Sequence, residues 1–184
     1  MKTALIIGAT GLVGAHVLDL LCQHPQYHKI KVFSRRPPSM KHEKIAYYET
    51  DFNDLDKFSE EITGDVLFSA LGTTLKKAGS KTAQYEVDYM YQFEMARLAA
   101  KSGVTHYLLV SALGANSKSL FFYNQMKGEL EEAVKTLSFQ NISIFQPSLL
   151  TGLRTEKRFG EQMAEKMMGA LKHIPVLSAY RPIP

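Results

Sequence analysis

Tyr123 and Lys127 stand four positions apart in a segment whose pattern predicts a helix. Residues at i and i+4 lie on one face of a helix, so the phenol and the ammonium are expected to be neighbours. A nearby positive charge favours the ionised phenol, which allows the tyrosine to exchange a proton with a carbonyl or alcohol group. Ser111 ends a strand-like run and is the candidate to hydrogen-bond the oxygen of such a substrate. The alternative interpretation is a packed tyrosine beside a surface lysine.

A second group of residues suits phosphate chemistry. Glycines recur at every third position from Gly8 to Gly14, between an aliphatic run and a helical pattern. Glycine permits a tight turn and a close approach of a pyrophosphate to the main chain, and the N-terminus of the helix offers N–H groups and a partial positive charge. The alternative is an ordinary strand-to-helix turn. The predicted dinucleotide contacts in this loop are Gly8, Thr10, Gly11, Leu12, Val13 and Gly14.

The second strand-like run ends in Ser34, Arg35 and Arg36. A site that prefers NAD places an acid there to bind the ribose hydroxyls, and this chain has none. Guanidinium groups pair bidentately with phosphate, so the two arginines predict recognition of the ribose 2′-phosphate of NADP(H). A solvated pair of loop arginines is the alternative.

Two further segments suit the adenosine half of such a cofactor. Asp51 and Phe52 follow the third strand-like run, where the carboxylate of Asp51 could lie near the adenine amino group; an exposed turn or cap is the alternative. Small residues follow the fourth run and could lie against the ribose and the pyrophosphate. These residues are Ala70, Leu71, Gly72 and Thr73.

The elements that must position these side chains alternate along the chain. Strands are predicted at 4–7, 30–33, 45–48, 66–69, 107–110 and 142–145, and helices at 12–23, 55–62, 82–101, 123–137 and 158–171. Such alternation implies right-handed crossovers and an α/β fold, a three-layer, doubly wound, mostly parallel sheet of the NAD(P)-binding Rossmann type. The predicted loops 35–43 and 72–81 follow strand ends, where open parallel sheets bind ligands. At 184 residues we expect one domain, residues 1–184, with a small C-terminal substrate or interaction region from about 148.

Composition excludes several classes of protein. Basic and acidic residues alternate near the C-terminus, so the net charge of +4 indicates a mixed solvated surface and no nucleic-acid partner. The apolar runs are too short to cross a membrane, and the six histidines lack the spacing of metal ligands. The lone Cys22 is typical of a reducing compartment, and we expect a cytoplasmic protein.

The motifs occur in the order that the short-chain dehydrogenase superfamily uses. The stretches 69–74, 87–89 and 127–131 make the chain similar to the HIV Tat-interacting protein family, the NmrA-like atypical members of that superfamily. The resemblance implies a Rossmann fold that binds NADP(H), and a catalytic triad of Ser111, Tyr123 and Lys127. Pro147 stands where many members hold a Pro-Gly pair against the nicotinamide, and Asp88 stands where many have asparagine in a proton relay.

Three functions are compatible with these residues. The leading hypothesis is an NADP(H)-dependent oxidoreductase that acts on a small-molecule carbonyl or alcohol. The first alternative is a non-catalytic regulatory protein that senses NADP(H) and binds a protein partner; the second is an enzyme similar to the sugar-nucleotide epimerases and dehydratases, against which we weigh the short region after residue 151. Aromatic residues in the predicted helix 82–101 are compatible with a homodimer interface and equally with burial in the monomer.

Overall fold

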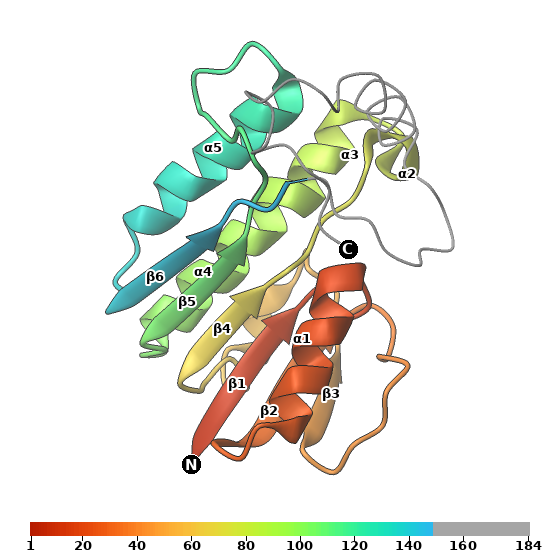
Figure 1. Ribbon diagram of the computed structural model, residues 1–184, viewed down its shortest axis with the longest axis vertical. Coiled ribbons are helices and arrows are strands. Elements are labelled where there is room, and N and C mark those ends of the chain that lie inside the picture. Colours follow the sequence, from red (N-terminus) through yellow and green to blue (C-terminus); the bar gives the residue numbers. More distant parts are fainter. Residues whose placement is uncertain (149–184) are drawn as a thin grey trace, which may run out of the picture.

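Six parallel strands form a single sheet in the order β3-β2-β1-β4-β5-β6 (Figure 1). The computed structural model describes residues 1–148. The chain moves outward from β1 to β3 on one side and from β4 to β6 on the other, so the order reverses between β1 and β4. The strands are β1 (Lys2–Ile7), β2 (Tyr27–Ser34), β3 (Ile45–Glu49), β4 (Val66–Ser69), β5 (His106–Val110) and β6 (Asn141–Phe145).

Helices cover both faces of the sheet, because the inner strands are apolar on both sides. In β1, Ala4 and Ile6 pack toward α1, while Leu5 and Ile7 pack toward α4 and α5. The three-layer Rossmann prediction is therefore confirmed. The helical elements are α1 (Leu12–Gln23), the 3-10 turn η1 (Leu55–Phe58), α2 (Leu75–Ala78), α3 (Lys81–Tyr85), the π-helical turn η2 (Glu86–Met90), α4 (Tyr91–Lys101) and α5 (Phe122–Lys135).

Two of the predicted helices differ from the structure. The predicted helix 55–62 is only the 3-10 turn η1, because the carbonyls that follow it turn toward β2, where the Lys31 ammonium binds Glu61 O at 2.7 Å and Thr63 O at 2.8 Å. The predicted helix 82–101 is interrupted by the π turn η2, and α2 lies inside the predicted loop 72–81. The predicted helix 158–171 lies outside the described residues.

Across residues 1–148, no helix combines the length and the apolar character that a membrane crossing requires. Cys22 lies in α1 with 3% of its surface exposed, and burial raises the pKa of its thiol. This cysteine is therefore a core residue with little tendency to ionise.

Candidate functional site

The turn from β1 to α1 is built around glycines that leave no room for side chains. Gly8 has a φ of +81°, and a Cβ on it would lie 2.3 Å from the carbonyl of Ala70 at the end of β4. A Cβ on Gly14, in the first turn of α1, would lie 2.1 Å from Gly8 O. Helix, turn and neighbouring strand therefore approach more closely than any other residue type would permit, which is the cradle that a pyrophosphate requires.

Helix α1 begins with its amides directed at the switch point of the sheet. Gly11 is the N-cap, contributes no side-chain hydrogen bond, and accepts the first helical bond from Ala15 N at 2.9 Å. The N–H groups of Leu12, Val13 and Gly14 consequently lack acceptors within the helix. No acidic residue occupies the first turn of α1, and Thr10 and Gly11 are exposed, so the end of this helix suits an anion.

A pocket of about 490 Å³ lies beyond the carboxyl ends of β2 and β3. Arg35, Asp51 and Phe52, all predicted cofactor contacts, form part of its lining. Arg36 is exposed beside it, and its carbonyl accepts a bond of 2.7 Å from the buried Ser34 hydroxyl, which fixes the course of the chain after β2. Because β2 is next to β1 in this parallel sheet, the pocket lies at the same edge of the sheet as the glycine turn.

Sequence reasoning missed several residues of this pocket, Asn53 and Tyr91 among them. The Tyr91 hydroxyl donates to Asn53 Oδ1 at 2.9 Å, and the Tyr91 ring stacks on Phe52 with 5.4 Å between centroids. Asp51 Oδ1 accepts from Asn53 N at 3.0 Å, so this carboxylate also caps its own turn, the alternative considered for it. A tyrosine inside a helical pattern gave no sign of this use, because its partner is 38 residues earlier in the chain.

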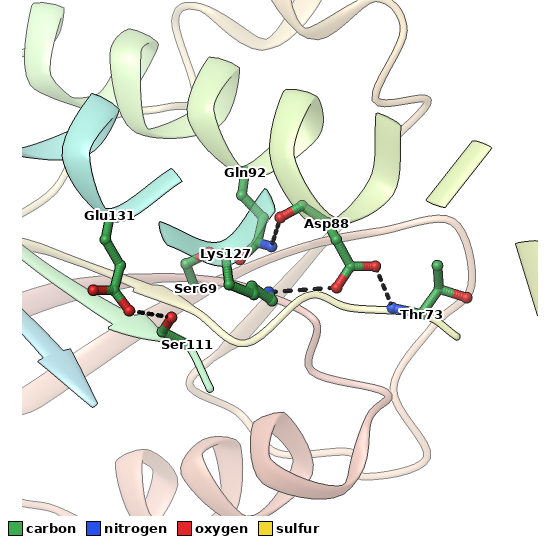
Figure 2. A network of polar contacts seen from close by, with 7 residues as sticks. All are labelled: Ser69, Thr73, Asp88, Gln92, Ser111, Lys127 and Glu131. Atoms are coloured by element: carbon green, nitrogen blue, oxygen red, sulfur yellow. Dashed lines mark hydrogen bonds and ion pairs between the residues drawn. The ribbon is translucent and has the colours of Figure 1, made fainter. Parts of the chain in front are cut away.

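The predicted reaction residues lie where β5 and α5 meet. Ser111 directly follows β5, while Tyr123 and Lys127 lie one turn apart at the start of α5. Ser111 is 6% exposed, and its hydroxyl donates to Glu131 Oε1 (Figure 2). Glu131 also accepts from Gln146 Nε2, at 2.9 Å and 3.0 Å to its two oxygens.

Glu131 and Gln146 were also missed by sequence reasoning. The spacing offered a signal, since Glu131 follows Lys127 by four positions and so continues the helix face that carries Tyr123. In this arrangement the hydroxyl proton of Ser111 lies in a hydrogen bond to the Glu131 carboxylate of the same chain.

Lys127 is paired with the other buried carboxylate of this region. Its ammonium lies 3.3 Å from Asp88 Oδ1, and the two side chains are 3% and 2% exposed. Asp88 Oδ2 accepts from Thr73 N at 2.8 Å, which joins the pair to the segment 70–73 after β4. Ala70, Leu71 and Thr73 are partly buried and Gly72 is exposed, beside the switch point of the sheet. Pro147 follows β6, and its carbonyl accepts from Leu113 N at 3.0 Å.

Most of the predicted site residues thus follow the carboxyl ends of β1, β2, β3, β4, β5 and β6 and meet at one edge of the sheet. They form two regions, which we call the adenosine side (at β1 to β3) and the reaction side (at β4 to β6) after the roles predicted from the sequence. Within residues 1–148, no group of three or more His, Cys, Asp or Glu side chains is arranged to hold a metal ion.

Comparison with known proteins agrees with this geometry. A family model described as NAD(P)H-binding matches residues 8–165. "Protein fmp52, mitochondrial" of Emericella nidulans is 39% identical over 180 residues, which cover 93% of this chain and 76% of that protein. "Protein HTATIP2" of Rattus norvegicus is 36% identical and covers 92% of this chain and 72% of that protein.

Solved structures show the same fold at low identity. WbmG of Bordetella bronchiseptica in complex with NAD has a TM-score of 0.69 at 14% identity, over 92% of this chain and 60% of that one. UDP-glucose 4-epimerase of Thermotoga maritima with UDP-glucose has a TM-score of 0.65 at 15% identity, over 84% of this chain and 58% of that one. This chain therefore spans less than two thirds of either structure, and such identities show the fold alone.

The expectation of a cytoplasmic protein is wrong by the same comparison, since relatives with 34% to 39% identity are named as mitochondrial. A single free cysteine indicates a reducing compartment without saying which one.

The fold, the glycine cradle and these similarities lead to one assignment: the chain belongs to the NAD(P)H-binding family, among the NmrA-like atypical short-chain dehydrogenases that include fmp52 and HTATIP2.

Proposed function

We propose that this protein is an NADP(H)-dependent oxidoreductase that acts on a small carbonyl or alcohol. The observation that carries the proposal is the position of Arg35 in the pocket beyond β2 and β3, at the edge of the sheet that also holds the glycine turn. A dinucleotide with its pyrophosphate at the N-terminus of α1 brings its adenosine ribose to this pocket. Arg35 and the adjacent Arg36 then bind the 2′-phosphate, with Asp51 and Phe52 beside the adenine.

The cofactor supplies or accepts a hydride when it is bound. Tyr123 gives a proton to the carbonyl oxygen of the substrate or takes one from its alcohol, and the ammonium of Lys127 favours the charged phenol. Ser111 orients the substrate by donating a hydrogen bond to its oxygen, for which the hydroxyl turns away from the Glu131 carboxylate that accepts its proton in the absence of substrate. Pro147 faces the nicotinamide half in this arrangement, and the segment 70–73 lies against the ribose and the pyrophosphate.

Turnover of NADPH with a panel of small aldehydes and ketones tests the catalytic proposal. Tyr123→Phe should abolish NADPH oxidation while the NADPH dissociation constant stays within about twofold of the wild type, since the phenol acts on the substrate. If the wild type binds NADPH and turns over no member of the panel, catalysis is contradicted and binding is not.

A regulatory protein that senses NADP(H) is the second candidate. The observation in its favour is that Ser111 and Lys127 both bind carboxylates of their own chain, Glu131 and Asp88. We assign a substrate or partner surface to the region from about residue 148 to 184 in either case, within one domain. Capture of partner proteins with and without NADPH tests this candidate, and identical capture profiles would count against it.

A further inference from the structure

One carboxylate, that of Asp88, joins two separate segments of the reaction side. Asp88 Oδ1 faces the ammonium of Lys127 at 3.3 Å, and Asp88 Oδ2 accepts the N–H of Thr73 at 2.8 Å (Figure 2). Thr73 belongs to the segment that follows β4, whereas Lys127 lies on α5. The side chain of Asp88 therefore ties the proposed cofactor loop to the lysine of the reaction side.

The π turn η2 places Asp88 at this point. A π turn holds one more residue than an α turn and thereby changes which side chains face inward. The Asp88 carbonyl accepts from Gln92 Nε2 at 2.7 Å, and Gln92 Oε1 accepts from the Ser69 hydroxyl at 2.8 Å. Backbone and side chain of Asp88 are thus both held by hydrogen bonds to the end of β4 and to α4.

The burial of the pair determines what Asp88 does electrostatically. With side chains 3% and 2% exposed, water screens neither charge. A buried ammonium without a counter-ion is strongly disfavoured and tends to lose its proton. Charged and titratable groups near Lys127 include Asp88 from η2, whose carboxylate contacts the ammonium, and Tyr123 and Glu131, each one turn away on α5. Asp88 is the carboxylate in contact with the ammonium, whereas Glu131 bonds to Ser111 and Gln146, so the direct counter-ion of Lys127 is Asp88.

We propose that Asp88 is a positioning residue that keeps Lys127 charged and couples its ammonium to the loop after β4. Where an asparagine could only hydrogen-bond, the aspartate also balances the charge. The coupling to the loop has a consequence for cofactor binding, and this consequence rests on the proposed function. The charge balance itself is independent of any ligand.

Urea unfolding of the protein without nucleotide tests the charge balance, with Asp88→Asn, Lys127→Met and the double variant. Asp88→Asn leaves an uncompensated ammonium, so its urea midpoint should fall by more at about pH 6.5 than at about pH 9, where Lys127 can release its proton. Adding Lys127→Met to Asp88→Asn should raise the midpoint again. Glu132→Gln, which removes an exposed carboxylate from the same helix, should shift the midpoint little at either pH.

The proposal is overturned if the loss in Asp88→Asn is equal at both pH values and unrelieved by Lys127→Met. If Asp88→Asn does not fold, the double variant decides: a folded double variant supports the pair, and an unfolded one contradicts it. Calorimetric titration with NADPH tests the coupling, and Asp88→Asn should weaken binding by about tenfold. Unchanged affinity would overturn the coupling, whereas a wild type that binds no NADPH would refute the proposed function and leave the unfolding result standing.

Discussion

The adenosine side and the reaction side of this site differ in whether their polar groups already have hydrogen-bond partners within the chain. On the adenosine side, main-chain amides at the start of α1 have no acceptor within the helix, and Arg35 lines an open pocket. On the reaction side, the Ser111 hydroxyl and the Lys127 ammonium bind the buried carboxylates of Glu131 and Asp88. The first region is ready for an anion, and the second is already hydrogen-bonded to itself.

The contrast separates cofactor binding from chemistry. Binding of a diphosphate needs backbone shape and positive charge, both of which the adenosine side provides in rigid form. Catalysis needs donors that a substrate can reach in the transition state. A protein with these two regions should bind NADP(H) firmly. Its turnover should depend on whether Ser111 and Lys127 can leave their carboxylate contacts to reach a substrate.

The largest expected effect comes from filling the glycine cradle. Gly8→Ala combines a φ of +81° with a Cβ only 2.3 Å from the Ala70 carbonyl, so we expect about 4 kcal/mol of lost stability or failure to fold. Gly79→Ala has a matching φ of +84° with nothing within 4 Å, and should cost about 1 kcal/mol. Urea unfolding compares the two, and equal costs would show that the close approach to β4 is not needed.

The second-largest effect is expected from removing the guanidinium group of Arg35 from the pocket. Arg35→Ala should weaken NADPH binding by about tenfold to a hundredfold, since a charge-assisted hydrogen bond contributes about 1.5–3 kcal/mol. NADH lacks the 2′-phosphate and should bind Arg35→Ala as it binds the wild type. Arg36→Ala is the matched variant, with the smaller expected effect because Arg36 is absent from the pocket lining. Parallel losses for NADPH and NADH would contradict phosphate recognition.

On the reaction side, Glu131→Gln should destabilise the fold by about 1–2 kcal/mol. The amide of glutamine turns a donor toward either Ser111 or Gln146, both of which donate to the carboxylate in the wild type. Urea unfolding measures the effect, with Glu132→Gln on the exposed face of α5 as the control. Equal stability of the two variants would mean that the Ser111 hydroxyl does not depend on Glu131.

The smallest expected effect is a fall in stability at alkaline pH, which arises from a tyrosine that lies beside α5. Burial and then the Glu129 carboxylate raise the pKa of Tyr85 from 10.0 to about 12. The folded protein therefore retains a proton that the unfolded chain releases, so this contribution to stability is complete below pH 10 and is lost as the pH rises toward 12. Tyr85→Phe should flatten the fall of the urea midpoint above about pH 10, and an unchanged slope would argue against this origin.

Local patterns predicted the fold and the adenosine side better than the reaction side. All six strands and α1 lie where the apolar runs and the glycine spacing indicated, because neighbouring residues determine both. The π turn at Asp88, the partner of Tyr91 and the carboxylate beside Ser111 depend on contacts between distant segments. The helix predicted at 55–62 failed for the same reason, since Lys31 of β2 binds the carbonyls that would have continued it.

Calorimetric titration of the intact protein with NADPH and NADH, side by side in one buffer, tests the central claim most directly. We predict saturable binding of both nucleotides, with NADPH at least about tenfold tighter because only NADPH carries the phosphate that Arg35 and Arg36 recognise. Equal affinities would contradict the assignment of the two arginines. Absence of binding by either nucleotide would contradict the anion cradle at Gly8, Gly11 and Gly14, and with it the whole account of the site.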